Sequence, residues 1–177
     1  MIAQKGIGTT DIVTLKVEKE ECGLFDEVIT HLKNCQLFSE LTNEQIKKLA
    51  AVFEITDYEA GDYIFRQGEL GDKLYVIERG LVNLQRKVNL GNSDVYVSIS
   101  FLGPYRLLGC WACLLGEYNH HTESAICQKP TRVITAKASE LKDILRSDLY
   151  ITILLLMQLC YMLGDKVNGV YSAMESL

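Results

Sequence analysis

Short runs of apolar and polar residues separated by glycines fill the middle of the chain. Between residues 59 and 80, four glycines at 61, 68, 71 and 80 flank runs rich in β-branched and aromatic side chains. Glycine tolerates positive φ, so this spacing indicates tight turns between strands. Strands are predicted at 54–58, 63–66, 73–78, 81–88, 94–102, 123–127 and 131–136, with a hairpin turn at 90–93.

Apolar residues recur at helical spacing on both sides of this region. Helices are predicted at 24–35, 43–53, 138–145 and 147–174, with a short helical piece at 110–115. Thr42 is the expected N-cap of the second helix, and Gly164 and Gly169 are weak points in the last one. Residues 1–23 form an N-terminal arm with one short strand at 12–17. The expected fold class is mainly β with flanking helices and a long C-terminal helix.

The composition fits one core of ordinary size. The chain has 177 residues, 48% hydrophobic, and a net charge of −5, which excludes a sequence-independent nucleic-acid surface. No secretory signal precedes the six cysteines, so we expect reduced thiols in a cytoplasmic protein. The apolar run from Leu149 to Leu163 is shorter than the roughly 20 residues that cross a bilayer, which favours a core or dimer helix over a membrane segment.

The glycine-rich run 59–80, together with LGPYRLLGCWACLL at 102–115, resembles the cyclic-nucleotide-binding domain family. This family includes catabolite-activator-type regulators and protein kinase A regulatory subunits. The resemblance covers about residues 30–177 and implies a double-stranded β-helix, or jelly-roll, barrel. It divides the chain into the arm 1–23, a barrel with its N-terminal helices at 24–145, and a dimerisation or lid helix at 146–177. It also implies a homodimer through that last helix.

The resemblance further implies an effector pocket. In the family, a helix that opens with Phe-Gly-Glu holds the cyclic phosphate, its Glu binds the ribose, and a later Arg pairs with the phosphate. Leu102, Gly103, Pro104, Gly109, Ala112 and Leu114 match this motif without gaps, but Cys110 takes the Glu position. The Arg position falls on Asn119, His120 or His121, and no Arg lies between Arg106 and Arg132. The candidate effector-binding residues are therefore Leu108, Gly109, Cys110, Trp111, Ala112, His120, His121 and Thr122.

These replacements predict weak or altered binding. A buried phosphate without its charged partner costs about 2–5 kcal/mol, or roughly 30- to 3000-fold in affinity. Two alternatives stay open. In the first alternative, backbone N–H groups and the two histidines hold cAMP or cGMP. In the other, Cys110 and Cys113 form a thiol or metal sensor, with His120, His121 and Cys127 near them. Against the sensor, Cys113 replaces an apolar core residue.

The remaining residues have simple structural interpretations. Trp111 fills the space left by the missing ligand, the histidine pair forms an exposed loop tip, and Arg106 is a surface charge. We find no nucleophile–base–acid set, no phosphate loop and no metal-ligand run with specific spacing, so an enzyme is not expected. The chain ends soon after the barrel, which leaves no room for a DNA-binding domain. The sequence thus predicts a stand-alone regulatory or sensor module in signal transduction that responds to a small-molecule effector.

Overall fold

The computed structural model describes residues 23–109, 114 and 119–175. Residues 23–34 are helical and lead into the 3-10 turn η1 (Gln36–Phe38) and helix α2 (Asn43–Ala50). Ten strands then precede helices α3 (Ala138–Ser147) and α4 (Leu149–Glu175). The strands are β1 (Phe53–Tyr58), β2 (Tyr63–Phe65), β3 (Leu70–Gly71), β4 (Lys73–Arg79), β5 (Val82–Asn89), β6 (Asp94–Leu102), β7 (Leu107–Gly109), β8 (Asn119–His120), β9 (Ser124–Cys127) and β10 (Thr131–Lys137).

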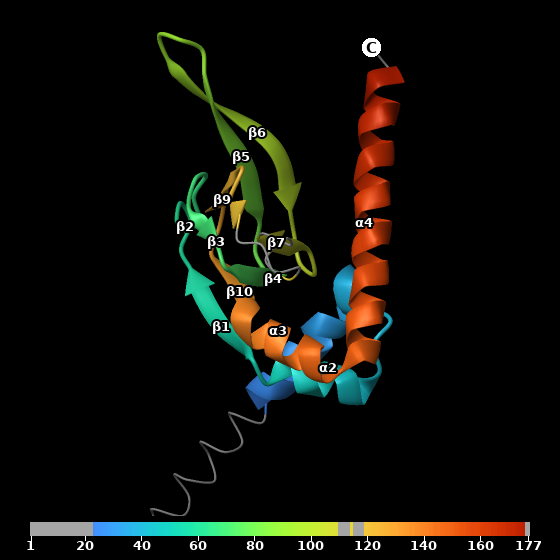
Figure 1. Cartoon of the computed structure of the whole chain (residues 1–177). Helices are drawn as coiled ribbons and strands as arrows, with labels where there is room; N and C mark the ends of the chain where they lie inside the picture. The colour runs from blue at the N-terminus through green and yellow to red at the C-terminus, as the bar shows by residue number, and fades with distance from the viewer. Residues whose placement is uncertain (1–22, 110–113, 115–118, 176–177) are drawn as a thin grey trace, which may run out of the picture.

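Two four-stranded antiparallel sheets form the β part of the fold. Their strand orders are β1-β10-β4-β7 and β2-β9-β5-β6, and β3 pairs with β8 in a separate two-stranded ladder. Among the described residues, this pairing does not close the sheets into one continuous barrel. The helices gather at one end of the sheets, α4 runs beside them, and the β5–β6 hairpin projects from the far end (Figure 1).

The hydrophobic core consists of two clusters of buried residues, and strand β4 contributes to both. Successive side chains of a strand point to opposite faces, so a strand covered on both sides is apolar throughout. Leu74 and Val76 belong to the cluster that includes the helices, whereas Tyr75 and Ile77 belong to the cluster that includes β2, β5 and β9. The sheets therefore pack on each other through one face, and the first sheet carries the helices on its other face.

Most predicted elements are confirmed, with several boundary corrections. The fold class is as expected, and Thr42 caps α2 in a reciprocal capping box with Gln45. The second helix ends at Ala50 and not at residue 53, because Phe53 begins β1 and pairs with Ala136. Helix α4 continues through Gly164 and Gly169. The arm, the strand at 12–17 and nearly all of the helical piece at 110–115 lie outside the described residues.

The apolar stretch of helix α4 is longer than the sequence predicts. Within it, residues 149–169 reach a mean hydropathy of 1.3, which by length and composition alone is sufficient to cross a membrane. The estimate based on Leu149–Leu163 was therefore too short. A single helix of this kind is weak evidence for a membrane segment, because core helices of other proteins have the same composition. Ile151, Leu155 and Leu159 lie on one face and are buried in the helical core cluster.

Candidate functional site

A cavity of about 700 Å³ lies between the sheets, the η1 turn and α4. Its size is within the usual range for small-molecule sites. Its walls combine apolar side chains with four charged ones, and it is lined by Cys35, Gln36, Phe65, Leu84, Ile99, Ser100, Leu102, Tyr105, Arg106, Leu107, Leu108, Gly109, Glu123, Met162, Asp165 and Lys166.

Strand β7 brings two of the predicted site residues to this cavity. Leu108 is buried and Gly109 lines the wall, with Gly109 opposite Leu74 of β4. Gly109 has φ +104°, and a Cβ there would lie 2.6 Å from the backbone oxygen of Lys73. Only glycine tolerates both the positive φ and the close approach of the Lys73 oxygen, so Gly109 allows β7 to lie tightly against β4 at the edge of the cavity.

The predicted histidine pair splits into one exposed and one buried residue. His120 is exposed and pairs with Leu70 in the β3–β8 ladder. His121 is buried, and its ring stacks on Phe65 with the centroids 3.9 Å apart. Its backbone N–H donates to the Glu69 oxygen at 2.8 Å, and its carbonyl accepts from Gly68 N–H at 2.8 Å. The interpretation of both histidines as an exposed loop tip is therefore wrong for His121.

Of the other predicted residues, Thr122 is exposed, and neither histidine is among the residues that line the cavity. His121 reaches it only through Phe65, which forms part of the wall. Cys110, Trp111, Ala112 and Cys113 lie outside the described residues. Their assignment to the effector site and the assignment of the histidines stay predictions.

We expect His121 to make stability depend on pH. Burial lowers the pKa of His121 below its ordinary value, and the carboxylates of Glu69 and Asp72 oppose that shift. Because the unfolded chain then takes up a proton first, the free energy of unfolding should fall as pH drops below about 6.5 and level off below the folded pKa. Denaturant titrations between pH 5 and 8 should show this slope, and His121→Phe should remove it. An unchanged slope in that variant would mean that another group is responsible.

None of the four charged residues that line the cavity is among the effector-binding residues predicted from the sequence. Arg106 is exposed, as expected of a surface charge, but it also lines the cavity. The turn that carries it is fixed to β4, since Tyr105 N–H donates to the Ile77 oxygen at 2.8 Å and Ile77 N–H donates to the Arg106 oxygen at 3.0 Å. Glu123 comes from the residue before β9, and Asp165 and Lys166 come from α4. Only the tertiary fold brings these segments together, and no local pattern marks them.

Two of the described thiols, Cys35 and Cys127, are not activated. Cys35, Cys127 and Cys160 are free. Burial raises the pKa of Cys35 to about 11 and also raises that of Cys127. Among the described residues, no group of three or more His, Cys, Asp or Glu side chains is arranged to hold a metal ion.

A match to a known protein family agrees with this fold. Residues 55–148, which run from β1 to the residue before α4, match the model of the cyclic nucleotide-binding domain. The chain belongs to the cyclic nucleotide-binding domain family. Members of the family share the jelly-roll arrangement, so the predicted fold class and the resemblance are both confirmed.

Curated relatives of this cyclic nucleotide-binding domain include cGMP-dependent protein kinases. It is 37% identical over 87 residues to the kinase egl-4 of Caenorhabditis briggsae, which is 47% of this chain and 12% of the kinase. It is 38% identical over 69 residues to the kinase of Plasmodium berghei, which is 37% of this chain and 8% of the kinase. The chain thus spans only a small part of the length of these kinases.

Solved structures give the same fold. A cyclic nucleotide-binding domain from Methylobacillus flagellatus matches with a TM-score of 0.71 at 18% identity, over 85% of this chain and 82% of that one. The catabolite activator protein of Thermus thermophilus matches at 0.66 and 24% identity, over 79% and 62%. The regulatory domain of Toxoplasma gondii PKA, crystallised with cAMP, matches at 0.64 and 19% identity, over 82% and 50%.

Proposed function

We propose that this chain is a non-enzymatic, cytoplasmic regulatory module in which the 700 Å³ cavity binds a small-molecule effector that differs from an ordinary cyclic nucleotide or is held more weakly. The observation that carries the proposal is the charge around the cavity. Arg106 and Lys166 are offset there by Glu123 and Asp165, so the described lining offers a phosphate no net positive charge. Free thiols at Cys35, Cys127 and Cys160 are compatible with a reducing compartment.

The sequence supports the same proposal at the positions that the family uses for its ligand. Cys110 stands where the resemblance implies a ribose-binding Glu, and no Arg occurs between Arg106 and Arg132. Of the two histidines among the candidate Arg positions, His121 is the buried one, and burial lowers its pKa, so near neutral pH it is a poor substitute for a fixed cation.

A thermal-shift titration of the full chain with cAMP and cGMP tests the proposal. A ligand that binds only the folded state at 1,000 times its Kd stabilises it by about 4 kcal/mol. For a chain of this size that raises Tm by roughly 8–16 °C, so a micromolar ligand supplied at about 1 mM would be obvious. We expect a shift of less than about 2 °C for both nucleotides. A shift near 10 °C would instead establish this chain as a genuine cyclic-nucleotide receptor.

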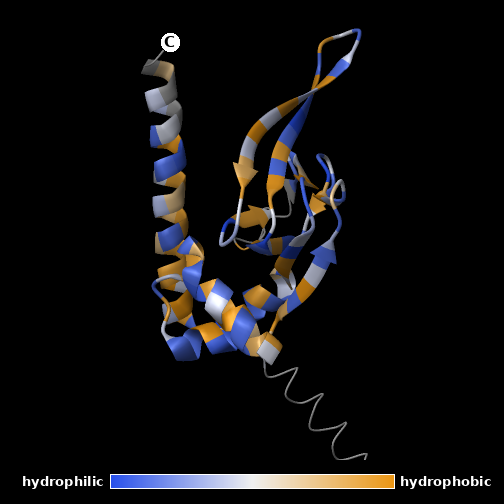
Figure 2. Cartoon of the chain, turned by 180° about the vertical axis from the view of Figure 1, so that it is seen from behind, coloured by the Kyte–Doolittle hydropathy of each residue, from blue (hydrophilic) through white to orange (hydrophobic). Residues whose placement is uncertain are grey.

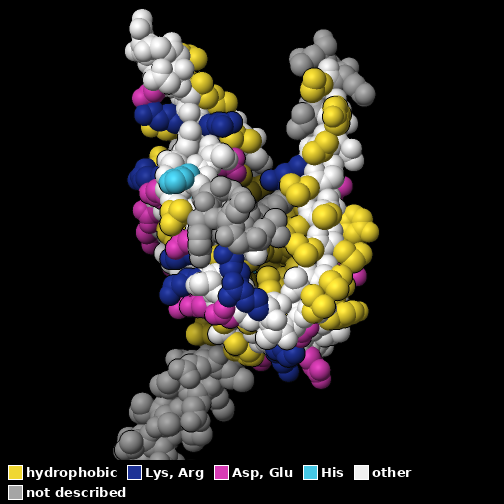
Figure 3. Space-filling model, in the orientation of Figure 1, with side chains coloured by type: hydrophobic (Ala, Val, Ile, Leu, Met, Phe, Trp, Pro, Cys, Tyr) yellow, Lys and Arg dark blue, Asp and Glu magenta, His cyan; other side chains and the backbone are white. Residues whose placement is uncertain are grey.

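We also propose that the module is a homodimer joined through α4. Eight exposed positions of α4 follow an unbroken three-four spacing, which is the seam pattern of a coiled coil. They are Tyr150, Ile153, Met157, Cys160, Gly164, Val167, Tyr171 and Met174. Hydrophobic residues recur along the helix (Figure 2), and their side chains gather over its exposed surface (Figure 3). The core-facing residues Ile151, Leu155 and Leu159 are not part of this seam.

This seam gives the apolar stretch of α4 a role other than crossing a membrane, and Asp165 and Lys166 within that stretch favour an aqueous setting. Light scattering at high micromolar concentration should give twice the chain mass. Met157→Glu should weaken the dimer by about tenfold or more, because it places two like charges in an apolar seam. Ser172→Glu, an exposed change outside the seam, is the matched control and should leave the dimer intact. A monomer for the unaltered chain would contradict the proposal.

A further inference from the structure

The β5–β6 hairpin extends beyond the rest of its sheet, and its outer half is a ribbon of only two strands. Strand β9 pairs with β5 from Val82 to Gln85, whereas β5 and β6 continue to pair as far as Asn89 and Asp94. The ribbon projects from the far end of the fold (Figure 1). A two-stranded ribbon is only marginally stable in water, so one more strand would stabilise this part of the sheet.

The two edges of this ribbon differ. On the β5 side, the Gln67 side chain takes the place of a neighbouring strand. Lys87 N–H donates to the Gln67 Oε1 at 2.8 Å, and the Gln67 Nε2 donates to the Lys87 oxygen at 3.4 Å. On the β6 side, no described strand follows, since β6 is the last strand of its sheet and pairs only with β5. The N–H and C=O groups of β6 that point away from β5 therefore have no partner among the described residues.

We propose that this free edge of β6 binds an extended segment of a partner protein, which adds to the four-stranded sheet as one further strand. The docking edge is residues 94–98, because the ladder with β5 is regular there and shifts register between Leu84 and Gln85. Five residues of the partner would pair with it.

Strand β6 lacks the features that protect exposed edges in other proteins. Such edges are usually short, charged or interrupted by proline. The edge strands β2 and β7 have three residues each, and the edge strand β1 carries Glu54 and Asp57. Strand β6 has nine residues and contains neither a charge nor a proline after Asp94. Among these edges, it is therefore the one best suited to accept another strand.

One face of the ribbon is apolar and exposed. Val88 is opposite Val95 and Arg86 is opposite Val97, so these four side chains lie on the same face. Leu84, two residues before Arg86, points to the same side and lines the 700 Å³ cavity. Val95 is 40% and Val97 is 49% exposed, so the two valines at the free edge are only partly covered. Apolar side chains of an added strand would cover them.

The opposite face of the ribbon is mostly polar, and its charged groups are already paired. Lys87 Nζ and Asp94 Oδ2 are 2.6 Å apart, and the Ser98 hydroxyl donates to Asn83 Oδ1 at 2.6 Å. An added strand therefore needs no charge on this side. The segment that fits the edge alternates β-branched apolar residues with small polar ones.

Helix α4 favours a single extended segment over a second copy of the sheet. Strand β6 lies on the α4 side of the hairpin in both views (Figures 1 and 2), and Ile99 of β6 lines the same cavity as Met162 of α4. The surface is hollowed between the hairpin and α4 (Figure 3). One strand occupies about 5 Å beside its neighbour, whereas a second sheet joined edge to edge would meet α4.

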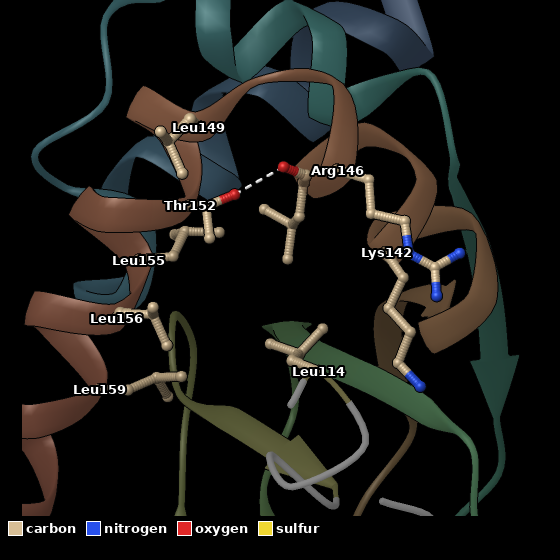
Figure 4. A pocket seen from close by; sticks show the side chains of 9 residues that line it. Leu114, Lys142, Arg146, Leu149, Thr152, Leu155, Leu156 and Leu159 are labelled. Atoms are coloured by element: carbon tan, nitrogen blue, oxygen red, sulfur yellow. Dashed lines mark hydrogen bonds between the residues drawn. The ribbon is translucent and has the colours of Figure 1, made fainter. Parts of the chain in front are cut away.

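A separate apolar cavity of about 370 Å³, between α3, α4 and Leu114, specifies no partner in this way (Figure 4). Its inward polar group is satisfied, because the Thr152 hydroxyl donates to the Leu145 carbonyl oxygen at 2.6 Å. Its leucines do not distinguish one apolar molecule from another. The unpaired backbone groups of β6, in contrast, select an extended chain.

Titration of the full chain with the peptide Asn-Thr-Val-Thr-Val-Thr-Asn, blocked at both ends, tests the proposal. We expect one peptide per chain, with a Kd below about 1 mM. The N–H groups of residues 94–98 that point away from β5 should exchange with solvent at least about tenfold more slowly when peptide is bound. The same peptide with every amide N-methylated should not bind, because it keeps the side chains but cannot donate to the edge.

Two matched variants locate the site on the β6 edge. Val97→Lys places a charge at the docking edge and should weaken peptide binding by about tenfold or more. Val88→Lys makes the same change on the same face but on β5, away from the free edge, and should alter affinity by less than about threefold.

Three results would overturn the proposal: no saturable binding at about 5 mM peptide, equal binding of the N-methylated peptide, or equal losses in the two variants. Light scattering provides a fourth check, since a mass of four chains that Val97→Lys reduces to two would mean that a second copy occupies the edge.

Discussion

Gly80→Ala should lower the free energy of unfolding by roughly 2–5 kcal/mol and Tm by about 5–15 °C. Gly80 lies between β4 and β5 with φ +113°, a conformation that side chains disfavour. An added Cβ would also lie 2.7 Å from the Cα of Thr131, which is buried at the start of β10. Neither atom can move without shifting a strand. Both costs therefore fall on the folded state.

Gly91→Ala separates the two costs. Gly91 has φ +91° at the β5–β6 turn, but no atom lies within 4 Å of its added Cβ. This variant should lose only the conformational part, about 1–2 kcal/mol. Urea denaturation of both variants with unchanged m-values gives the comparison. Equal losses in the two variants would show that close packing against Thr131 does not restrict Gly80.

Long elements of this fold were predictable because their signals are local. The strand predicted at 73–78 corresponds to β4, which is one residue longer, since its apolar run and flanking glycines are visible in the sequence. Strands β3, β7 and β8 were missed because each has only two or three residues and exists through a distant partner. Leu70 pairs with His120, for example, and Leu107 pairs with Val76. Phe53 was assigned to a helix because its spacing fits one, whereas its partner Ala136 makes it a strand residue.

The lining of the cavity, which is the candidate site, was predictable to the extent that a contiguous motif describes it. Leu108 and Gly109 follow from the Leu-Gly-Pro motif, and both line the cavity. Arg106 is next to the same motif, yet its place on the cavity wall depends on the turn that joins it to Ile77. Asp165 comes from α4, which is distant in sequence from every other part of the cavity. The apolar spacing of α4 predicts a helix but does not indicate which of its charged residues the sheets will meet.

Restoring the family's charged pair should create nucleotide affinity. In the double variant Cys110→Glu, His121→Arg, we expect the affinity for cAMP to rise by about 100-fold or more. The Arg contributes roughly 2 kcal/mol or more through a buried phosphate pair, and the Glu contributes about 1 kcal/mol through the ribose hydroxyl. Position 121 is chosen because its side chain stacks on Phe65, which lines the cavity, while its backbone is held by Gly68 and Glu69.

His120→Arg in place of His121→Arg is the matched control. It adds the same charge one residue away, but residue 120 is exposed, so affinity should change by less than about threefold. The double variant should also be less stable without ligand, since an Arg at position 121 buries a permanent charge that the carboxylates of Glu69 and Asp72 offset only in part. Added cAMP should then raise its Tm much more than that of the unaltered chain. If both positions give equal gains, the phosphate cation does not belong at residue 121, and if neither gives any, the cavity has lost more than two side chains.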